Sequence, residues 1–140
     1  MMQQTKRSIQ WIIDNKIFFL PRKKKWAGIH LIVEFWGGRI IESEKELQFL
    51  LDNAVKAAET TPLNTSIHKF EPQGITGLVL LAESHISIHT WPELNYMAID
   101  LFTCGDKSRP MKALEFLKQE LKPERVEIKK IKRGGVELLN

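Results

Sequence analysis

Side chains that can act as nucleophile, base and proton donor are concentrated in one stretch of the sequence, residues 81–106. The candidates are Ser84, His85, His89 and Cys104, with Glu83 and Glu93 as neighbouring acids. A serine, an imidazole and a thiol that meet in a fold can supply these three chemical roles. Each residue alone is more often structural, because a lone buried cysteine behaves as a small hydrophobe and serines near histidines usually form hydrogen-bonded polar patches.

The two histidines also raise the question of a metal site, since imidazole is a common metal ligand. His85 and His89 are four residues apart in the sequence. On a β-strand this spacing separates them by roughly 13 Å, which is too far for both to bind one ion. We therefore expect no metal at this site.

The segment that carries these side chains is predicted to be a β-hairpin. Residues 85–91 and 96–102 alternate in polarity, and the sequence Pro-Glu-Leu-Asn between them is typical of a turn. The pairs that follow are Trp91 with Tyr96, His89 with Ala98, and Glu83 with Cys104. This register predicts that Ser84, His89 and Cys104 converge at the open end of the hairpin, whereas a bulge would reverse the faces.

The elements that must position the hairpin follow from hydrophobic periodicity and from glycine and proline breaks. Further strands are expected at 28–36, 64–70, 78–82 and 126–131. Helices are expected from Glu44 to about Glu59, behind a capping box of Ser43 and Glu46, and from Ser108 and Pro110 to Pro123. The order predicts an α+β two-layer sandwich, with a mainly antiparallel sheet and two helices on one face. The other face then meets solvent or a partner.

Charge is distributed unevenly along the 140 residues. Residues 1–26 hold seven basic and one acidic side chain, whereas residues 27–140 hold 14 basic and 16 acidic ones. The net charge of +4 therefore belongs to a basic N-terminal extension, 1–26, which is expected to be a short helix or a mobile arm. Residues 27–140 are expected to form the one domain, for which the charge gives no reason to expect a nucleic-acid partner.

Cysteine content and hydropathy bear on the compartment. Cys104 is the single cysteine, which excludes an intrachain disulfide and a four-cysteine zinc site and favours the reducing cytoplasm. The apolar stretch Ile9–Leu20 is interrupted by polar residues at 14–16. It is too short for a membrane span and lacks the pattern of a signal peptide, so we expect neither.

The sequence resembles one known family in these same segments. The runs AESHISIHTWPE at 82–93 and YMAIDLFTCGD at 96–106 are similar to the prokaryotic S-adenosylmethionine decarboxylase proenzymes, which are pyruvoyl-dependent. The similarity continues through GIHL at 28–31, Phe70 and GITG at 74–77 to Arg133 and Gly134. It covers roughly residues 27–134.

The resemblance implies self-cleavage between Glu83 and Ser84 into a β chain, 1–83, and an α chain, 84–140. Ser84 would become the pyruvoyl cofactor, which holds the substrate as a Schiff base. The other implied roles are His89 as processing base, Thr76 as a supporting hydroxyl, Cys104 as proton donor, Phe70 as adenine-stacking ring and Glu93 as ribose acceptor. The family usually has serine at the position of Thr76, which keeps the hydroxyl and adds a methyl group.

The function implied is decarboxylation of S-adenosylmethionine to the aminopropyl donor of spermidine synthesis, by a homodimer or higher oligomer of processed protomers. Two alternatives remain open at this point. One is a pyruvoyl-dependent decarboxylase of arginine or another basic amino acid. The other is a relative that is not processed and serves as a binding or regulatory module.

Overall fold

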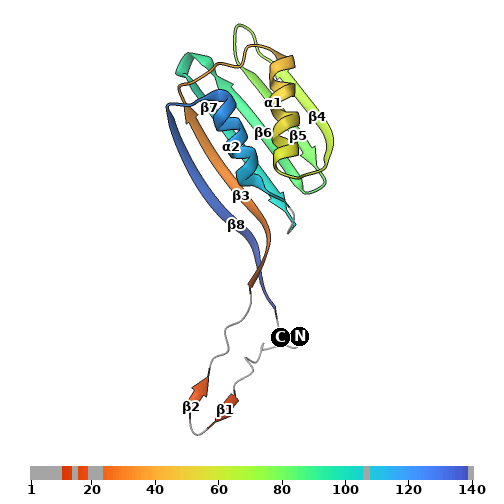
Figure 1. Ribbon diagram of the computed structural model, residues 1–140, viewed down its shortest axis with the longest axis vertical. Helices are drawn as coiled ribbons and strands as arrows, with labels where there is room; N and C mark the ends of the chain where they lie inside the picture. Colours follow the sequence, from red (N-terminus) through yellow and green to blue (C-terminus); the bar gives the residue numbers. More distant parts are fainter. Residues whose placement is uncertain (1–10, 14–15, 19–23, 106–107, 139–140) are drawn as a thin grey trace, which may run out of the picture.

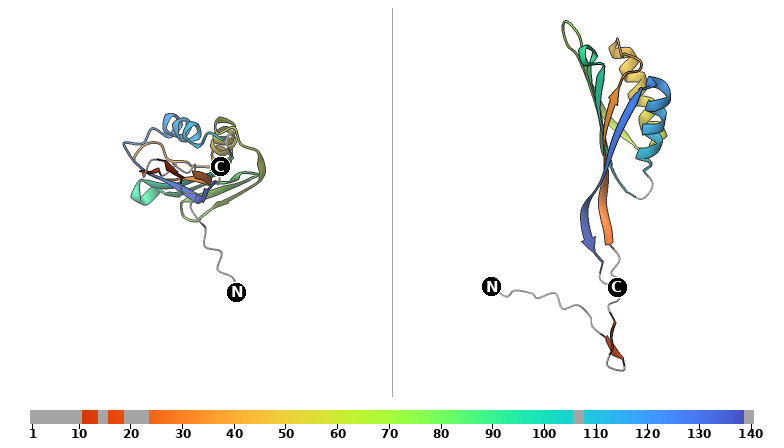
Figure 2. Two further views of the ribbon diagram at one scale, coloured as in Figure 1. Left: turned by 90° about the horizontal axis from the view of Figure 1, so that it is seen from below. Right: turned by 90° about the vertical axis from the view of Figure 1, so that its left-hand side faces the viewer.

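The computed structural model describes residues 11–13, 16–18, 24–105 and 108–138. Within these residues, six strands form one sheet and two α-helices cover one of its faces (Figures 1 and 2). In spatial order the strands are β4 (Pro62–Lys69), β5 (Ile75–Leu81), β6 (Ser84–Trp91), β7 (Tyr96–Cys104), β3 (Lys24–Trp36) and β8 (Arg125–Glu137). All neighbouring strands are antiparallel, so the predicted α+β sandwich is confirmed.

The helices begin where the sequence signals predict. Helix α1 (Glu44–Ala57) starts after Ser43, whose side-chain oxygen accepts the Glu46 backbone N–H at 3.1 Å. Helix α2 (Pro110–Leu121) has Pro110 in its first turn, where a missing N–H costs nothing. Neither helix is long and apolar enough to cross a membrane, and the described residues contain no other α-helix.

The hydrophobic core lies between the helices and the inner face of the sheet. Alternate residues of β3 face it, as the period of a strand requires: Leu31, Val33 and Phe35 are buried. The helices contribute Leu47, Leu50, Leu51 and Ala54 from α1 and Ala113, Leu114 and Leu117 from α2. Helix α1 packs closely on β5, because a Cβ placed on Gly77 would lie 2.7 Å from a methyl carbon of Leu47.

Two neighbouring strands, β3 and β8, are longer than predicted. β3 begins at Lys24 rather than at 28, and β8 runs from Arg125 to Glu137 rather than over 126–131. Their ends pair as Lys24 with Glu137, in a two-stranded ribbon that projects beyond the sheet (Figure 2). The periodicity misses these ends because all their described residues are exposed, so no buried face imposes an alternation.

The N-terminal extension differs from its prediction where the structure describes it. The sequence predicts either a short helix or a mobile arm for 1–26, yet β1 (Trp11–Ile13) and β2 (Lys16–Phe18) are short strands paired with each other. Residues 24–26 belong to β3. The rest of the extension, including Arg22 and Lys23, lies outside the described residues.

The second face of the sheet, called the open face below, is covered by no described helix (Figure 2). It presents exposed apolar side chains together with polar ones. Leu78 and Leu80 of β5 are 42% and 51% exposed, and Trp91 of β6 is 39% exposed. All of the predicted site residues on β5, β6 and β7 other than Ser84 have the parity of this face.

Candidate active site

The predicted cleavage point lies at the tight turn between β5 and β6. Ser84 has a φ of +141°, a region that non-glycine residues rarely adopt and that costs about 1–3 kcal/mol. The carbonyl oxygen of Glu83 accepts the backbone N–H of Cys104 at 2.9 Å. A strained serine therefore follows a carbonyl group that is already polarised by a hydrogen-bond donor.

The side chain of Glu83 anchors this turn to the start of β4. Its carboxylate accepts the backbone N–H of Thr61 at 3.0 Å and the Thr61 hydroxyl at 3.2 Å. The backbone hydrogen bond from Thr61 is the main cause that lowers the pKa of Glu83. Because these bonds favour the ionised form, Glu83 holds a negative charge beside the cleavage point.

The predicted hairpin register is confirmed. Trp91 pairs with Tyr96 and His89 pairs with Ala98, and the Cys104 N–H reaches Glu83 as that register requires. Cys104 is half-buried at the end of β7. Ser84, Glu83 and Cys104 therefore meet at one end of the sheet, where β6 begins beside the end of β7.

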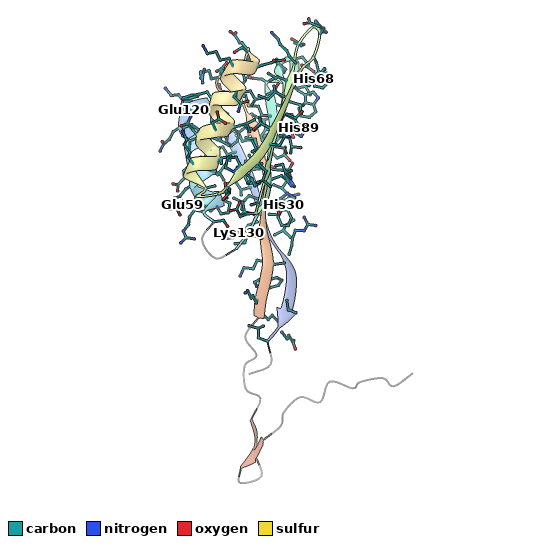
Figure 3. All side chains as sticks on the ribbon, turned by 90° about the vertical axis from the view of Figure 1, so that its right-hand side faces the viewer. His30, Glu59, His68, His89, Glu120 and Lys130 are labelled. Carbon is teal, nitrogen blue, oxygen red and sulfur yellow. The ribbon has the colours of Figure 1, made fainter. Side chains whose placement is uncertain are left out.

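His89 does not join this group, so the predicted convergence of Ser84, His89 and Cys104 is wrong. His89 and Ser84 both lie on β6, five positions apart, which is a separation of roughly 16 Å along an extended strand. Figure 3 shows His89 on the sheet well above His30, toward the end that carries His68. The register itself is as predicted, but the five-residue length of strand between Ser84 and His89 keeps the two side chains apart.

His89 instead forms a pair with Thr76. The Thr76 side-chain oxygen lies 3.0 Å from Nδ1 of His89, across adjacent positions of β5 and β6. The hydroxyl that Thr76 shares with serine is the group that makes this contact. The predicted base and its predicted supporting hydroxyl are thus in direct contact.

The two predicted substrate-binding residues lie at the His89 end. Phe70 follows β4 directly and is 47% exposed, and its backbone N–H bonds the Gly74 carbonyl at 2.8 Å. Glu93 is exposed in the 3-10 helix η1 (Pro92–Leu94), which connects β6 to β7. The candidate site therefore consists of two groups on one protomer: the Ser84 group, with Glu83 and Cys104, and the His89 group, with Thr76, Phe70 and Glu93.

Two polar residues that the sequence did not single out, His30 and Asp100, lie beside the candidate His85 between the two groups. Nε2 of His30 is 2.7 Å from a carboxylate oxygen of Asp100. The ring of His30 also meets that of His85 edge-on, with ring centres 6.3 Å apart. Burial is the main cause that lowers the pKa of His85. The alternation of residues 28–36 and 96–104 could have placed these side chains on one face, but not in contact.

A second pair on the open face joins Tyr96 to Glu34. The Tyr96 hydroxyl donates to a carboxylate oxygen of Glu34. Burial, together with this carboxylate, raises the pKa of Tyr96 to about 12. As for metals, the described residues include no group of three or more His, Cys, Asp and Glu side chains placed to hold an ion.

Comparison with known proteins decides the family. The family model described as S-adenosylmethionine decarboxylase matches residues 29–134. This chain belongs to the S-adenosylmethionine decarboxylase family. The match includes both helices, four whole strands of the large sheet and most of β3 and β8, so the Ser84 group and the His89 group both lie inside the family region.

Individual family members are similar over most of the chain. The S-adenosylmethionine decarboxylase proenzyme of Methanococcus vannielii is 47% identical over 116 residues, which cover 81% of this chain and 95% of that protein. The proenzyme of Hydrogenobaculum sp. is 43% identical over 115 residues, 81% of this chain and 86% of that one. The crystal structure of adenosylmethionine decarboxylase from Aquifex aeolicus superposes with a TM-score of 0.77 at 38% identity, and covers 83% of this chain and 98% of that one.

Proposed function

We propose that this protein is a self-processing, pyruvoyl-dependent enzyme that decarboxylates S-adenosylmethionine to the aminopropyl donor used for spermidine. Membership of the family supports the reaction. The observation that carries self-processing is the Glu83–Ser84 bond itself: the Cys104 N–H already binds the Glu83 carbonyl, and Ser84 is in a strained conformation. Both features favour attack on this bond over its neighbours.

The cleavage chemistry follows from these groups. Oγ of Ser84 attacks the Glu83 carbonyl carbon, and the Cys104 N–H stabilises the negative charge that develops on the carbonyl oxygen. The peptide bond becomes an ester, which releases the strain at Ser84. Removal of the Ser84 α-proton then breaks the bond between Cβ and Oγ of Ser84. This step releases the new main-chain carboxylate of Glu83 and leaves dehydroalanine at position 84. Addition of water and loss of ammonia then give a pyruvoyl group on the backbone nitrogen of residue 85.

The residues present fit a pyruvoyl group at position 84. The group supplies a carbonyl that binds the substrate amine and accepts the electron pair left by carbon dioxide. The Cys104 side chain is adjacent in the sheet, because its N–H bonds the Glu83 carbonyl. We assign to its thiol the proton that the product carbon receives, since a thiol gives up a proton more readily than a hydroxyl.

A second copy of the chain completes the site in this proposal. His89, Thr76, Phe70 and Glu93 lie too far along the sheet to act on Ser84 of their own protomer. A two-fold axis through the open face would bring the Ser84 group of one protomer against the His89 group of its partner. The exposed apolar side chains Leu78, Leu80 and Trp91 on that face support such pairing.

The division of the chain forms part of the same proposal. The catalytic domain is assigned to residues 27–140 and the extension to residues 1–26, except that residues 24–26 already belong to β3 of the domain's sheet. In support, the family model begins at residue 29 and ends at residue 134. Processing would separate β chain 1–83 from α chain 84–140, and pairing of β5 with β6 and of β3 with β7 would keep the two together.

Release of labelled carbon dioxide tests the reaction. The purified protein is supplied in parallel with carboxyl-labelled S-adenosylmethionine, arginine and ornithine. We expect release from S-adenosylmethionine alone. Release from arginine or ornithine without release from S-adenosylmethionine would refute the substrate. The Ser84→Ala variant serves as the control and should release no carbon dioxide from any of the three.

A further inference from the structure

Phe70 has a fixed backbone and an exposed ring. Its N–H bonds the Gly74 carbonyl at 2.8 Å, yet 47% of the residue is exposed just past the end of β4. An exposed aromatic side chain samples several rotamers, and each rotamer points the ring in a different direction. If Phe70 stacks on a nucleobase, either a neighbouring group must hold its ring in the productive rotamer, or the free energy of binding must offset the cost of ordering the ring.

His68 is placed to make that selection. It precedes Phe70 by two positions, so the two side chains leave the chain on the same face. Their ring centres are 4.6 Å apart and the ring planes are inclined at 73°, an edge-to-face contact. Such contacts are favourable beyond the area they bury, because the positive edge of one ring meets the negative face of the other.

We propose that His68 is a positioning residue, which holds the Phe70 ring in the orientation that stacks on the adenine of the substrate. This role rests on the proposed function, in which Phe70 receives the adenine. His68 itself touches no reacting group in this account. It acts by ordering the Phe70 ring before the substrate arrives, while the exposed part of that ring stays accessible to the adenine.

The neighbours of His68 allow its role to be separated from processing. It lies opposite Thr76, which pairs in turn with His89. The Thr76 side-chain oxygen is engaged with His89 at 3.0 Å, and no hydrogen bond joins the His68 ring to any residue that the structure describes. Loss of the His68 ring should therefore disturb the ring of Phe70 and leave cleavage intact.

The expected effect is a change in KM with little change in kcat. Removing one edge-to-face contact should raise KM for S-adenosylmethionine about two- to tenfold in His68→Ala. His68→Phe keeps an aromatic ring at the position and should restore KM to within about twofold of the wild type. The matched control is Ser66→Ala, since Ser66 lies two residues before His68 on the same exposed face of β4 and should leave KM unchanged.

A double-mutant cycle supplies the decisive readout. The probe is 5′-deoxy-5′-methylthioadenosine, which carries the adenine and ribose without the amino-acid part, and its dissociation constant is measured by calorimetry. His68→Ala should weaken binding in the wild-type background by the same factor as KM. In a Phe70→Ala background it should have no further effect, because the ring that His68 orders is already gone.

Two results would overturn the proposal. One is an unchanged KM and probe affinity in His68→Ala; the other is an equal loss in the presence and absence of Phe70. Extent of cleavage is measured for each variant, so that a fall in kcat through poor processing is not mistaken for the effect. If the wild type binds the probe but does not decarboxylate S-adenosylmethionine, the proposed reaction fails while the cycle still tests His68.

Discussion

Complementation between two inactive variants tests whether one site is built from two chains. Ser84→Ala removes the nucleophile, and His89→Ala removes the proposed processing base. The two residues are five positions apart on β6, roughly 16 Å along the strand, and no side chain spans that distance. Each variant expressed alone should therefore remain uncut. Together they should regain cleavage, because His89 of one chain would act on Ser84 of the other.

The expected yield follows from the symmetry of the dimer. If the two variants are produced in equal amounts and pair at random, about half of the dimers are mixed. A mixed dimer has one site with both residues intact and one site with neither. About half of the His89→Ala chains should thus be cut, no Ser84→Ala chain should be cut, and about a quarter of all sites should become active.

The assay uses a different affinity tag on each variant, so that mixed dimers are isolated by two successive purifications. Mass spectrometry then identifies which chain was cut, and carbon dioxide release gives activity per dimer. The reasoning would be refuted if isolated mixed dimers contained only uncut chains. Cleavage of His89→Ala expressed alone would equally contradict it. A site contained within one chain gives no complementation, so the two arrangements are clearly distinguished.

Three further predictions concern single positions. Cys104→Ala keeps the backbone N–H that binds the Glu83 carbonyl, so this variant should still be cut. Its turnover of S-adenosylmethionine should fall about 10²- to 10⁴-fold, because the proton-donating thiol is gone. Undiminished turnover would contradict the role of the thiol. Gly77→Ala places a methyl group 2.7 Å from Leu47 and should lower the free energy of unfolding, measured by urea denaturation, by about 1–3 kcal/mol. An unchanged midpoint of the urea denaturation curve would contradict close packing of α1 on β5. Burial lowers the pKa of His85, so the unfolded chain binds its proton first as the pH falls through about 6.5, and folding stability should decrease there. In His85→Gln this part of the acid-induced fall in melting temperature should disappear, and its persistence would show that another group titrates.

Local patterns were sufficient for most of the fold. The alternation on both sides of the turn at 92–95 set the register of β6 with β7, because a buried face on one side makes any one-residue slip costly. Ser43 predicted the start of α1. Its side chain accepts the N–H of the third helical residue, which has no acceptor within the helix, and so it fixes locally where the helix begins. The projecting ends of β3 and β8 escaped prediction because pairing with each other, not burial, holds them in strands.

The residues of the candidate site could be predicted from the sequence, but most of their positions relative to one another could not. The resemblance to the family indicated which residues to expect in the site. The predicted hairpin register placed Glu83 opposite Cys104, and the two are hydrogen-bonded in the structure. The contact of His30 with Asp100 depends on how β3 pairs with β7, which are 70 residues apart at that point, and no local pattern determines it. The separation of His89 from Ser84 was available from strand geometry, which gives about 3.3 Å per residue.

The central claim is that Ser84 becomes a pyruvoyl group by cleavage of the Glu83–Ser84 bond. The mass of the purified protein under denaturing conditions tests it most directly. The account predicts two fragments, residues 1–83 and residues 84–140, with the second lacking a free amino group and therefore blocked to sequencing from its amino end. A single chain of 16.2 kDa that stays intact on prolonged incubation, with Ser84 recovered in an unbroken peptide, would contradict it.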